Sequence, residues 1–207
     1  MKKMKKLLSV VLVLSLAVTM LIGCGGPKTS PEDSAKIFLD VLLKDDKTNM
    51  EKIGMTEEDY TKFRSELESG MMEGFASTGL DESVITDEVK NQLKSDLLTG
   101  LSKLEYEVST STTEKDTAKV EVKIKPFDLT KVSTDAQKKL EADFTANPSM
   151  TQADIFKASF KYVGEGIAAG TVKDEAKPVT FTLTKESNVW LPGENDVVAL
   201  MNVIVGM

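Results

Sequence analysis

The chain has 207 residues, of which 33 are acidic and 26 basic, and it holds one cysteine and no histidine. Without histidine it lacks the commonest general base near neutral pH and the commonest zinc ligand. This excludes catalytic triads, zinc hydrolases and two-histidine iron sites as they are usually built. A single cysteine cannot form an internal disulfide. We therefore expect no metal and no cofactor, and we assign no catalytic residue.

The first 23 residues have the organisation of a secretory signal peptide. Four lysines (Lys2, Lys3, Lys5 and Lys6) precede an apolar stretch of 16 residues from Leu7 to Ile22. A helix that spans a membrane needs about 20 apolar residues, and no basic stop-transfer cluster follows this stretch. The pattern predicts a segment that directs export and is then removed.

The signal ends in Leu21-Ile22-Gly23-Cys24, which resembles the lipobox of bacterial lipoproteins. The resemblance implies transfer of a diacylglyceryl group to the sulfur of Cys24, cleavage between Gly23 and Cys24, and acylation of the new amino group. The alternatives are an ordinary secreted protein with a free thiol, or a cysteine that follows the apolar stretch by chance. Two or more acyl chains hold a protein stably at a bilayer. We predict a lipid-anchored protein on the extracytoplasmic face of the cell membrane.

Removal of the signal leaves 184 residues with a formal charge of −11, because the signal holds four of the basic residues and none of the acidic ones. We expect residues 24–29 to be the lipidated cysteine and a spacer of turn residues, and residues 30–207 to form one domain. An acidic surface repels the phosphates of nucleic acid. A nucleic-acid partner is therefore not expected.

Three helices are predicted before any strand. Ser30-Pro31-Glu32-Asp33 is a typical helix start, with an N-cap serine, proline at the first helical position and acids in the first turn. Apolar residues at helical spacing continue from it to about Lys44. Similar starts at Thr56 and Thr86 introduce two more amphipathic helices.

From Leu104 the apolar residues alternate, which predicts an antiparallel hairpin from Leu104 to Ile124 with one solvated face. Two helices follow, one from Thr134-Asp135 to Asn147-Pro148 and one from Thr151 to Ile167. A second hairpin covers Val179 to Leu191, and the apolar tail from Val197 to Val205 predicts a packed terminal helix. The fold class is α+β: amino-terminal helices on a curved, cone-like antiparallel sheet, with a helical insertion between two hairpins.

In this order of elements the chain resembles a group of uncharacterised lipoproteins of Gram-positive bacteria. Their mature part is similar to the cystatin-like and nuclear-transport-factor-two-like cone fold. The features that carry the resemblance are the lipobox, the helix at Ser30-Pro31-Glu32-Asp33, the first hairpin, and the second hairpin with Trp190 in its last strand. The resemblance implies a fold but no activity, because folds of this kind host enzymes, ligand binders and interaction modules.

Four aromatic residues are candidates for lining a ligand pocket, because cone folds often bind small molecules and such side chains combine apolar walls with a polar group: Tyr60, Tyr106, Tyr162 and Trp190. Each also falls in or near an apolar stripe, so core packing is the simpler interpretation. The acidic pairs Glu57-Glu58 and Asp87-Glu88 stand at predicted helix starts and are interpreted as first-turn acids, while Asp81-Glu82 is interpreted as solvated.

The sequence favours a non-enzymatic module that binds a protein or peptide at the cell envelope. The alternative is a small-molecule-binding lipoprotein that serves a transporter or sensor, which would need an apolar cavity between helices and sheet. A third hypothesis is an enzyme that moves a proton between a tyrosine and a carboxylate, which would need a tyrosine beside a desolvated acid in a deep cavity.

Overall fold

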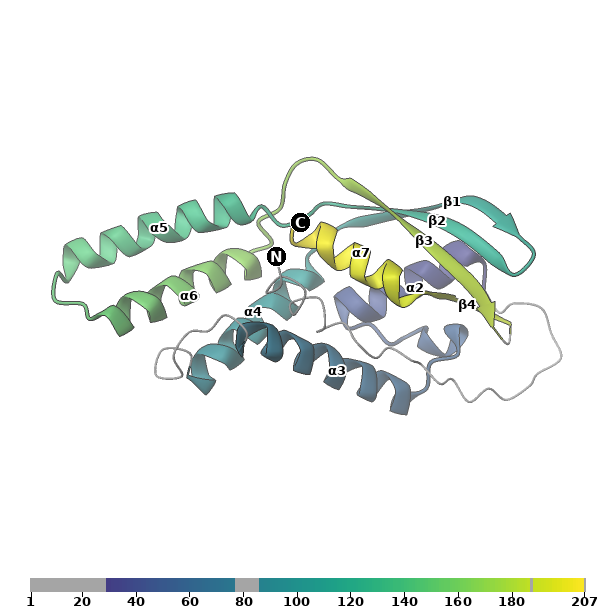
Figure 1. The fold of residues 1–207 in the computed structure, drawn as a ribbon, viewed down its shortest axis with the longest axis horizontal. Coiled ribbons are helices and arrows are strands. Elements are labelled where there is room, and N and C mark those ends of the chain that lie inside the picture. Colours follow the sequence, from purple (N-terminus) through teal and green to yellow (C-terminus); the bar gives the residue numbers. More distant parts are fainter. Residues whose placement is uncertain (1–28, 77–85, 187, 207) are drawn as a thin grey trace, which may run out of the picture. The chain divides into compact units, whose positions relative to one another are not determined.

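The computed structural model describes residues 29–76, 86–186 and 188–206, which contain six α-helices and a four-stranded antiparallel sheet that curls into a half-barrel (Figure 1). The predicted α+β class is confirmed. The described residues divide into two compact units. We call residues 29–67, 104–126 and 174–206 the sheet unit, and residues 68–76, 86–103 and 127–173 the helical unit. One domain over residues 30–207 stays a prediction.

Two hairpins build the sheet, as the alternating pattern predicted. The first joins β1 (Tyr106–Glu114) to β2 (Thr117–Ile124), and the second joins β3 (Lys177–Glu186) to β4 (Val189–Pro192). The strand order is β1-β2-β3-β4, with Val120 opposite Phe181 where the hairpins meet. Along β2 the even-numbered residues are buried and the odd-numbered ones face outward, so the sheet has one apolar and one solvated face.

The sheet unit also holds α2 (Pro31–Lys44), the 3₁₀ helix η2 (Met50–Ile53), the first part of α3 (Glu57–Ala76) and α7 (Glu194–Ile204). The predicted start of α2 is confirmed, because the hydroxyl of Ser30 accepts a hydrogen bond from the amide of Asp33 at 3.1 Å. The turn η2 was not predicted. It ends at Gly54, whose φ of 76° lies in the left-handed region that suits glycine.

Helix α2 packs on the apolar face of the sheet and fills it. Phe38 of α2 meets Phe63 of α3 and Phe181 of β3 edge to face, with ring centroids 6.2 and 6.5 Å apart. The inward residues of the sheet are at most 6% exposed: Ala118, Val120, Val122, Ile124, Val179, Phe181 and Leu183. These side chains therefore form a packed core between α2 and the sheet.

Helix α7 confirms the predicted terminal helix, although it begins three residues earlier than expected. It packs against β3 and buries Val197, Leu200 and Ile204. Asp196 accepts hydrogen bonds from the backbone of Gly193 and of Thr182 on β3. The apolar tail is thus part of the core of the sheet unit.

The helical unit contains α4 (Asp87–Ser102), α5 (Leu129–Ala146) and α6 (Gln152–Ala168). Helix α6 packs against both α4 and α5. The starts of α4 and α6 are confirmed at Thr86 and Thr151, whose hydroxyls accept backbone hydrogen bonds in the first turn. No helix in the described part of the chain is long and apolar enough to cross a membrane.

The predicted start of α5 at Thr134-Asp135 was wrong. The helix begins five residues earlier, where the carboxylate of Asp128 accepts a hydrogen bond from the amide of Lys131 at 3.0 Å. Thr134 lies inside the helix, and its hydroxyl donates to the carbonyl of Thr130 one turn earlier. A threonine can make either kind of local bond, so its presence alone does not locate a helix start.

Candidate functional site

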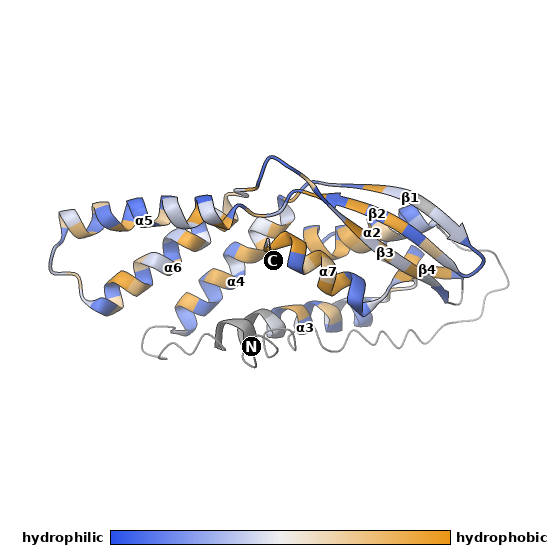
Figure 2. Cartoon of the chain, turned by 45° about the horizontal axis from the view of Figure 1, so that its top comes forward, coloured by the Kyte–Doolittle hydropathy of each residue, from blue (hydrophilic) through white to orange (hydrophobic). Residues whose placement is uncertain are grey.

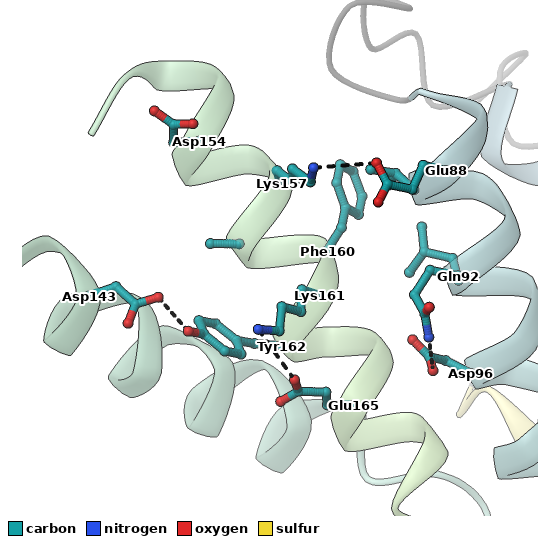
Figure 3. Close-up of a pocket in the computed structure, with 13 residues that line it drawn as sticks. Glu88, Gln92, Asp96, Asp143, Asp154, Lys157, Phe160, Lys161, Tyr162 and Glu165 are labelled. Carbon is teal, nitrogen blue, oxygen red and sulfur yellow. Dashed lines mark hydrogen bonds and ion pairs between the residues drawn. The ribbon is translucent and has the colours of Figure 1, made fainter. Parts of the chain in front are cut away.

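The helical unit carries an open groove of about 540 Å³ along α6, bounded by α4 on one side and α5 on the other (Figure 3). Its lining combines apolar residues with charged ones: Glu88, Val89, Gln92, Leu93, Asp96, Asp143, Asp154, Lys157, Ala158, Phe160, Lys161, Tyr162 and Glu165. We call this feature the α4–α6 groove. A second hollow of similar size lies in the sheet unit.

Two glycines set the distance between α4 and α6. A Cβ on Gly100 would stand 2.5 Å from the carbonyl oxygen of Ile167, and a Cβ on Gly164 would stand 2.3 Å from a carboxylate oxygen of Asp96. Real Cβ atoms do not come so close to oxygen. A side chain at position 100 would meet backbone atoms, so this position needs glycine, whereas at position 164 the obstacle is the flexible side chain of Asp96. The helices are parallel here, since residues 96 and 100 of α4 meet residues 164 and 167 of α6. They touch at these carboxyl-terminal turns, and the groove extends toward their amino-terminal turns.

The floor of the groove is apolar. Val89 and Leu93 of α4 are each 7% exposed, and they stand one turn apart on the side of the helix that lines the groove. Phe160 of α6 is only half-buried and lies between the two helices in Figure 3. The predicted apolar stripe of α6 is half-buried throughout: Ile155, Phe156, Phe160 and Val163. Figure 2 shows hydrophobic segments recurring along α6, whereas most of α5 is hydrophilic or neutral.

The rim of the groove is acidic, and its lysines are already paired. Lys157 of α6 reaches Glu88 of α4 at 3.5 Å, and Lys161 lies 4.0 Å from Glu165 on the same helix. Lys139 of α5 also binds Glu165, at 2.8 Å. These groups are largely exposed, so each pair contributes little to stability.

Asp96 differs from the other rim acids. It accepts a hydrogen bond from the neutral amide of Gln92 at 2.9 Å, and no lysine or arginine of the described residues forms an ion pair with it. It lies above Gly164, where the absence of a side chain makes room for its carboxylate. The inner end of the groove therefore carries a negative charge without a cationic partner.

Tyr162 lies on the α5 side of the groove and donates its hydroxyl to Asp143. The ammonium groups of Lys139 and Lys161 stand 5.1 and 5.6 Å from its ring centroid. The hydrogen bond to Asp143, with a smaller contribution from burial, raises the pKa of the Tyr162 phenol. The hydroxyl keeps its proton near neutral pH, and that proton is engaged by the carboxylate.

The second hollow, of about 530 Å³, lies in the sheet unit between α2 and the open end of the first hairpin. Tyr106 at the start of β1 donates to Asp40 of α2 at 2.5 Å, and Lys36 binds the other oxygen of that carboxylate at 2.6 Å. Burial, followed by the bond to Asp40 and its negative charge, raises the pKa of Tyr106 strongly. The rest of the lining consists of lysine and glutamate side chains and Ala176.

The remaining two aromatic candidates lie elsewhere in the sheet unit. Tyr60 of α3 donates to Asp45 at 2.5 Å, and Arg64 binds the same carboxylate at 3.1 Å. Trp190 of β4 is 4% exposed and belongs to the core. The structure thus places Tyr106 and Tyr162 in separate hollows and does not bring the four predicted aromatic residues together.

Sequence reasoning missed the residues that give the groove its character, namely Asp96, Gln92 and Gly164. Phe160, Val89 and Leu93 fall within the predicted helices, but the helical pattern of the sequence does not distinguish groove residues from core residues. The pair Glu57-Glu58 and the pair Asp87-Glu88 do stand in first turns of helices, as predicted. Asp81-Glu82, Gly23 and Cys24 lie outside the described residues.

Both hollows combine charged side chains with apolar surface. Within residues 29–76, 86–186 and 188–206, no three cysteine, aspartate or glutamate side chains are grouped to hold a metal ion. Each tyrosine donates its hydroxyl in a hydrogen bond to a carboxylate, and its raised pKa keeps the phenol protonated near neutral pH. An apolar floor with a charged rim is typical of a binding groove.

By its architecture the chain is an α+β protein that combines a curled four-stranded antiparallel sheet with a groove lined by α4, α5 and α6. The chain belongs to the DUF5105 family, a domain of unknown function, whose family model matches residues 24–202. It is similar in structure to YcdA, a candidate lipoprotein from Bacillus subtilis subsp. subtilis str. 168 known from a crystal structure.

The similarity to YcdA has a TM-score of 0.70 at 21% sequence identity, so it shows a shared fold. It covers 85% of this chain and 56% of YcdA, so the chain spans little more than half the length of that protein. The comparison with curated proteins found no match.

Proposed function

We propose that the chain is a lipid-anchored, non-enzymatic protein on the extracytoplasmic face of the cell membrane, and that the α4–α6 groove binds a peptide or a segment of another envelope protein. The observation that carries the binding role is the half-buried Phe160 above Val89 and Leu93 in an open groove with a charged rim. Concave sites with an apolar floor and a few polar groups at the rim are where ligands commonly bind.

Three observations support the anchor. The sequence Leu21-Ile22-Gly23-Cys24 has the pattern of a lipobox, the family match begins at Cys24, and a structurally similar protein is a candidate lipoprotein. Only five residues, 25 to 29, separate Cys24 from the N-cap Ser30. At about 3.5 Å per residue, this spacer would hold the start of α2 within roughly 20 Å of the lipid.

The proposal that the chain is not an enzyme is supported by the tyrosine–aspartate pairs. A proton-transfer enzyme of the kind considered above would need a tyrosine whose proton is free to move or an acid that is desolvated. Here Tyr60, Tyr106 and Tyr162 each donate the hydroxyl to an aspartate. Two of these aspartates also form an ion pair, because Asp45 binds Arg64 and Asp40 binds Lys36.

A small-molecule ligand is the second candidate, and one observation favours it. The groove volume falls within the range of about 300 to 1,000 Å³ that is common for small-molecule sites. However, the groove is partly open to solvent and lined by residues of three helices, which suits a segment of a larger partner better. A small ligand would appear as a discrete added mass in native mass spectrometry of the purified protein.

The anchor is tested by growing cells with labelled palmitate. The full-length chain should take up label and sediment with membranes, and Cys24→Ala should do neither. A labelled Cys24→Ala variant would contradict lipidation at this residue.

The binding role is tested by placing a photo-crosslinking amino acid at position 160 of the full-length, anchored protein. Position 144 is the matched control, because Phe144 is an aromatic residue of the same unit that is 47% exposed and does not line the groove. Irradiation of intact cells should give a discrete adduct from position 160 and not from position 144, and Leu93→Glu should remove it. Equal adducts from both positions, or none from position 160, would refute the proposal.

A further inference from the structure

The α4–α6 groove has two chemically different ends, which constrains what can bind in it. Its outer part is the apolar floor of Val89, Leu93 and Phe160, and its inner end holds the carboxylate of Asp96. One turn further along, Gly100 meets Ile167 and the two helices close on each other. A ligand in the groove would meet apolar surface first and a negative charge at the closed end.

The charge at that end is free to attract a cation. Glu88 and Glu165 already have lysine partners, Asp143 accepts the hydroxyl of Tyr162, and Asp154 is used in the capping box of α6. Asp96 has only the neutral amide of Gln92 among the described residues. It is also the more sheltered acid, partly buried where Glu88 is exposed. An ion pair with a ligand would therefore be less screened at Asp96 than at the outer rim.

The apolar floor and the carboxylate of Asp96 are about one helical turn apart along the groove. Phe160 precedes Gly164, the residue beneath Asp96, by four positions on α6, and Leu93 precedes Asp96 by three positions on α4. These separations correspond to about 5 Å along a helix axis. In a helical ligand that lies along the groove, an apolar and a basic side chain with the same separation would stand at positions i and i+3 or i+4.

The charge of the groove lining favours a basic ligand. The lining holds five acids and two lysines, and both lysines are already paired inside the protein. An acidic or neutral helix would leave Asp96 without a partner or would repel it, whereas a basic one would satisfy it. Helices commonly bind by laying an apolar stripe into a groove between two other helices.

We propose that the α4–α6 groove binds a basic amphipathic helix of a partner protein, with a large apolar side chain against Phe160 and Leu93 and a lysine or arginine one turn away on Asp96. This inference rests on the proposed binding function and names the chemical class of the partner. Asp96 is the specificity-determining residue, and the floor provides contact area.

The test uses labelled helical peptides of about 20 residues in an alanine-rich host, titrated with the detergent-solubilised, lipidated protein. The pair peptide carries leucine and arginine at i and i+4. The displaced peptide has the same composition with each arginine on the opposite face, and the citrulline peptide replaces arginine by its neutral isostere. We expect the pair peptide to bind roughly tenfold more tightly than either of the other two, and this preference to shrink at high salt.

Variants of the protein test whether Asp96 and Phe160 are responsible for the preference for the pair peptide. Asp96→Asn keeps the shape and the contact with Gln92 and should weaken the pair peptide about tenfold, without changing the citrulline peptide. Phe160→Ala should weaken all three peptides. Glu114→Gln, an exposed charge at the end of β1 outside the groove, is the matched control and should change none. Circular dichroism of each variant shows that it is folded.

The two proposals fail differently. If the pair and citrulline peptides bind equally and Phe160→Ala weakens both, the charge inference is overturned and the groove remains a binding site. If no peptide binds while position 160 still forms its adduct in cells, the helix class is wrong and the proposed function stands. If neither binding nor an adduct is found, both are overturned.

Discussion

At the scale of single residues, the same local arrangement occurs three times. Each tyrosine of the chain donates its hydroxyl to an aspartate: Tyr60 to Asp45, Tyr106 to Asp40 and Tyr162 to Asp143. A phenol that donates to a carboxylate loses this bond on ionisation and then faces a second negative charge. The pKa of all three phenols is therefore raised, and most strongly that of Tyr106, where burial adds to the effect.

The alkaline titration of tyrosine should show these pairs. In guanidinium the three phenols should ionise near pH 10, and in the folded protein above it. Because the folded pKa values are raised, the stabilisation they provide is complete below about pH 10 and is lost as the pH rises through the folded values. The measurement is tyrosinate absorbance at 295 nm with and without denaturant. Tyr106→Phe should remove the component that titrates last and cost about 1 kcal/mol of stability; a native titration near pH 10 would contradict the pairing.

At the scale of elements, hydropathy period and helix caps predicted most of the fold. Ser30, Thr86 and Thr151 all accept the first-turn hydrogen bonds that their sequence context indicates. The exception is α5, because Thr134 bonds inside the helix and the true cap, Asp128, follows a buried phenylalanine and gives no clear start. A sequence pattern therefore locates the start of a helix when the hydrogen bond that caps the helix is made by a residue within that pattern.

The groove could not be predicted in the same way, because long-range contacts define it. Asp96 and Gly164 are 68 positions apart, and neither is unusual in its own helix. A stripe such as Ile155, Phe156 and Phe160 indicates one buried side of a helix, but not how completely the neighbouring helices cover it. The position of Gly164 near the end of α6 hinted at a close helix contact, without indicating its partner.

The close contact between α4 and α6 predicts different losses of stability when Gly100 and Gly164 are replaced by alanine. Alanine favours a helix over glycine by about 1 kcal/mol, but a Cβ at position 100 would clash with a backbone carbonyl that cannot move alone. We expect Gly100→Ala to destabilise the protein by about 1 to 3 kcal/mol. Gly164→Ala should cost less, since the Asp96 side chain in its way can rotate.

Chemical denaturation of each variant measures these differences. Ser95→Ala, on the exposed side of α4, reports the change in helix propensity without a new contact. If Gly100→Ala is as stable as Ser95→Ala, the close approach of the two helices is not required for the fold.

At the scale of the whole molecule, the two units differ in how much they bury. The sheet unit has a continuous core in which Phe181, Leu183, Leu39 and Leu42 are at most 1% exposed. In the helical unit, α5 buries only Val132 and Ala136, and α6 buries only Gly164. A helix that buries little apolar surface has little to hold it in place beyond its own backbone hydrogen bonds. We therefore expect the helical unit to open locally more readily than the sheet unit.

Hydrogen exchange of the lipidated protein should separate the two units. We expect amides of β2 and β3 to exchange only on global unfolding, and those of α5 and the amino-terminal half of α6 to exchange at least tenfold faster through local opening. Low concentrations of denaturant should accelerate amide exchange in the helical unit first, which would make it a separate cooperative unit and argue against one domain over residues 30–207.

A basic amphipathic helix bound in the groove should slow amide exchange in α4 and α6 and leave exchange in β2 unchanged. Equal protection of amides in both units, with a single response to denaturant, would instead mean that the chain unfolds as one domain. In that case the half-buried apolar stripe does not make α6 open more readily than the sheet.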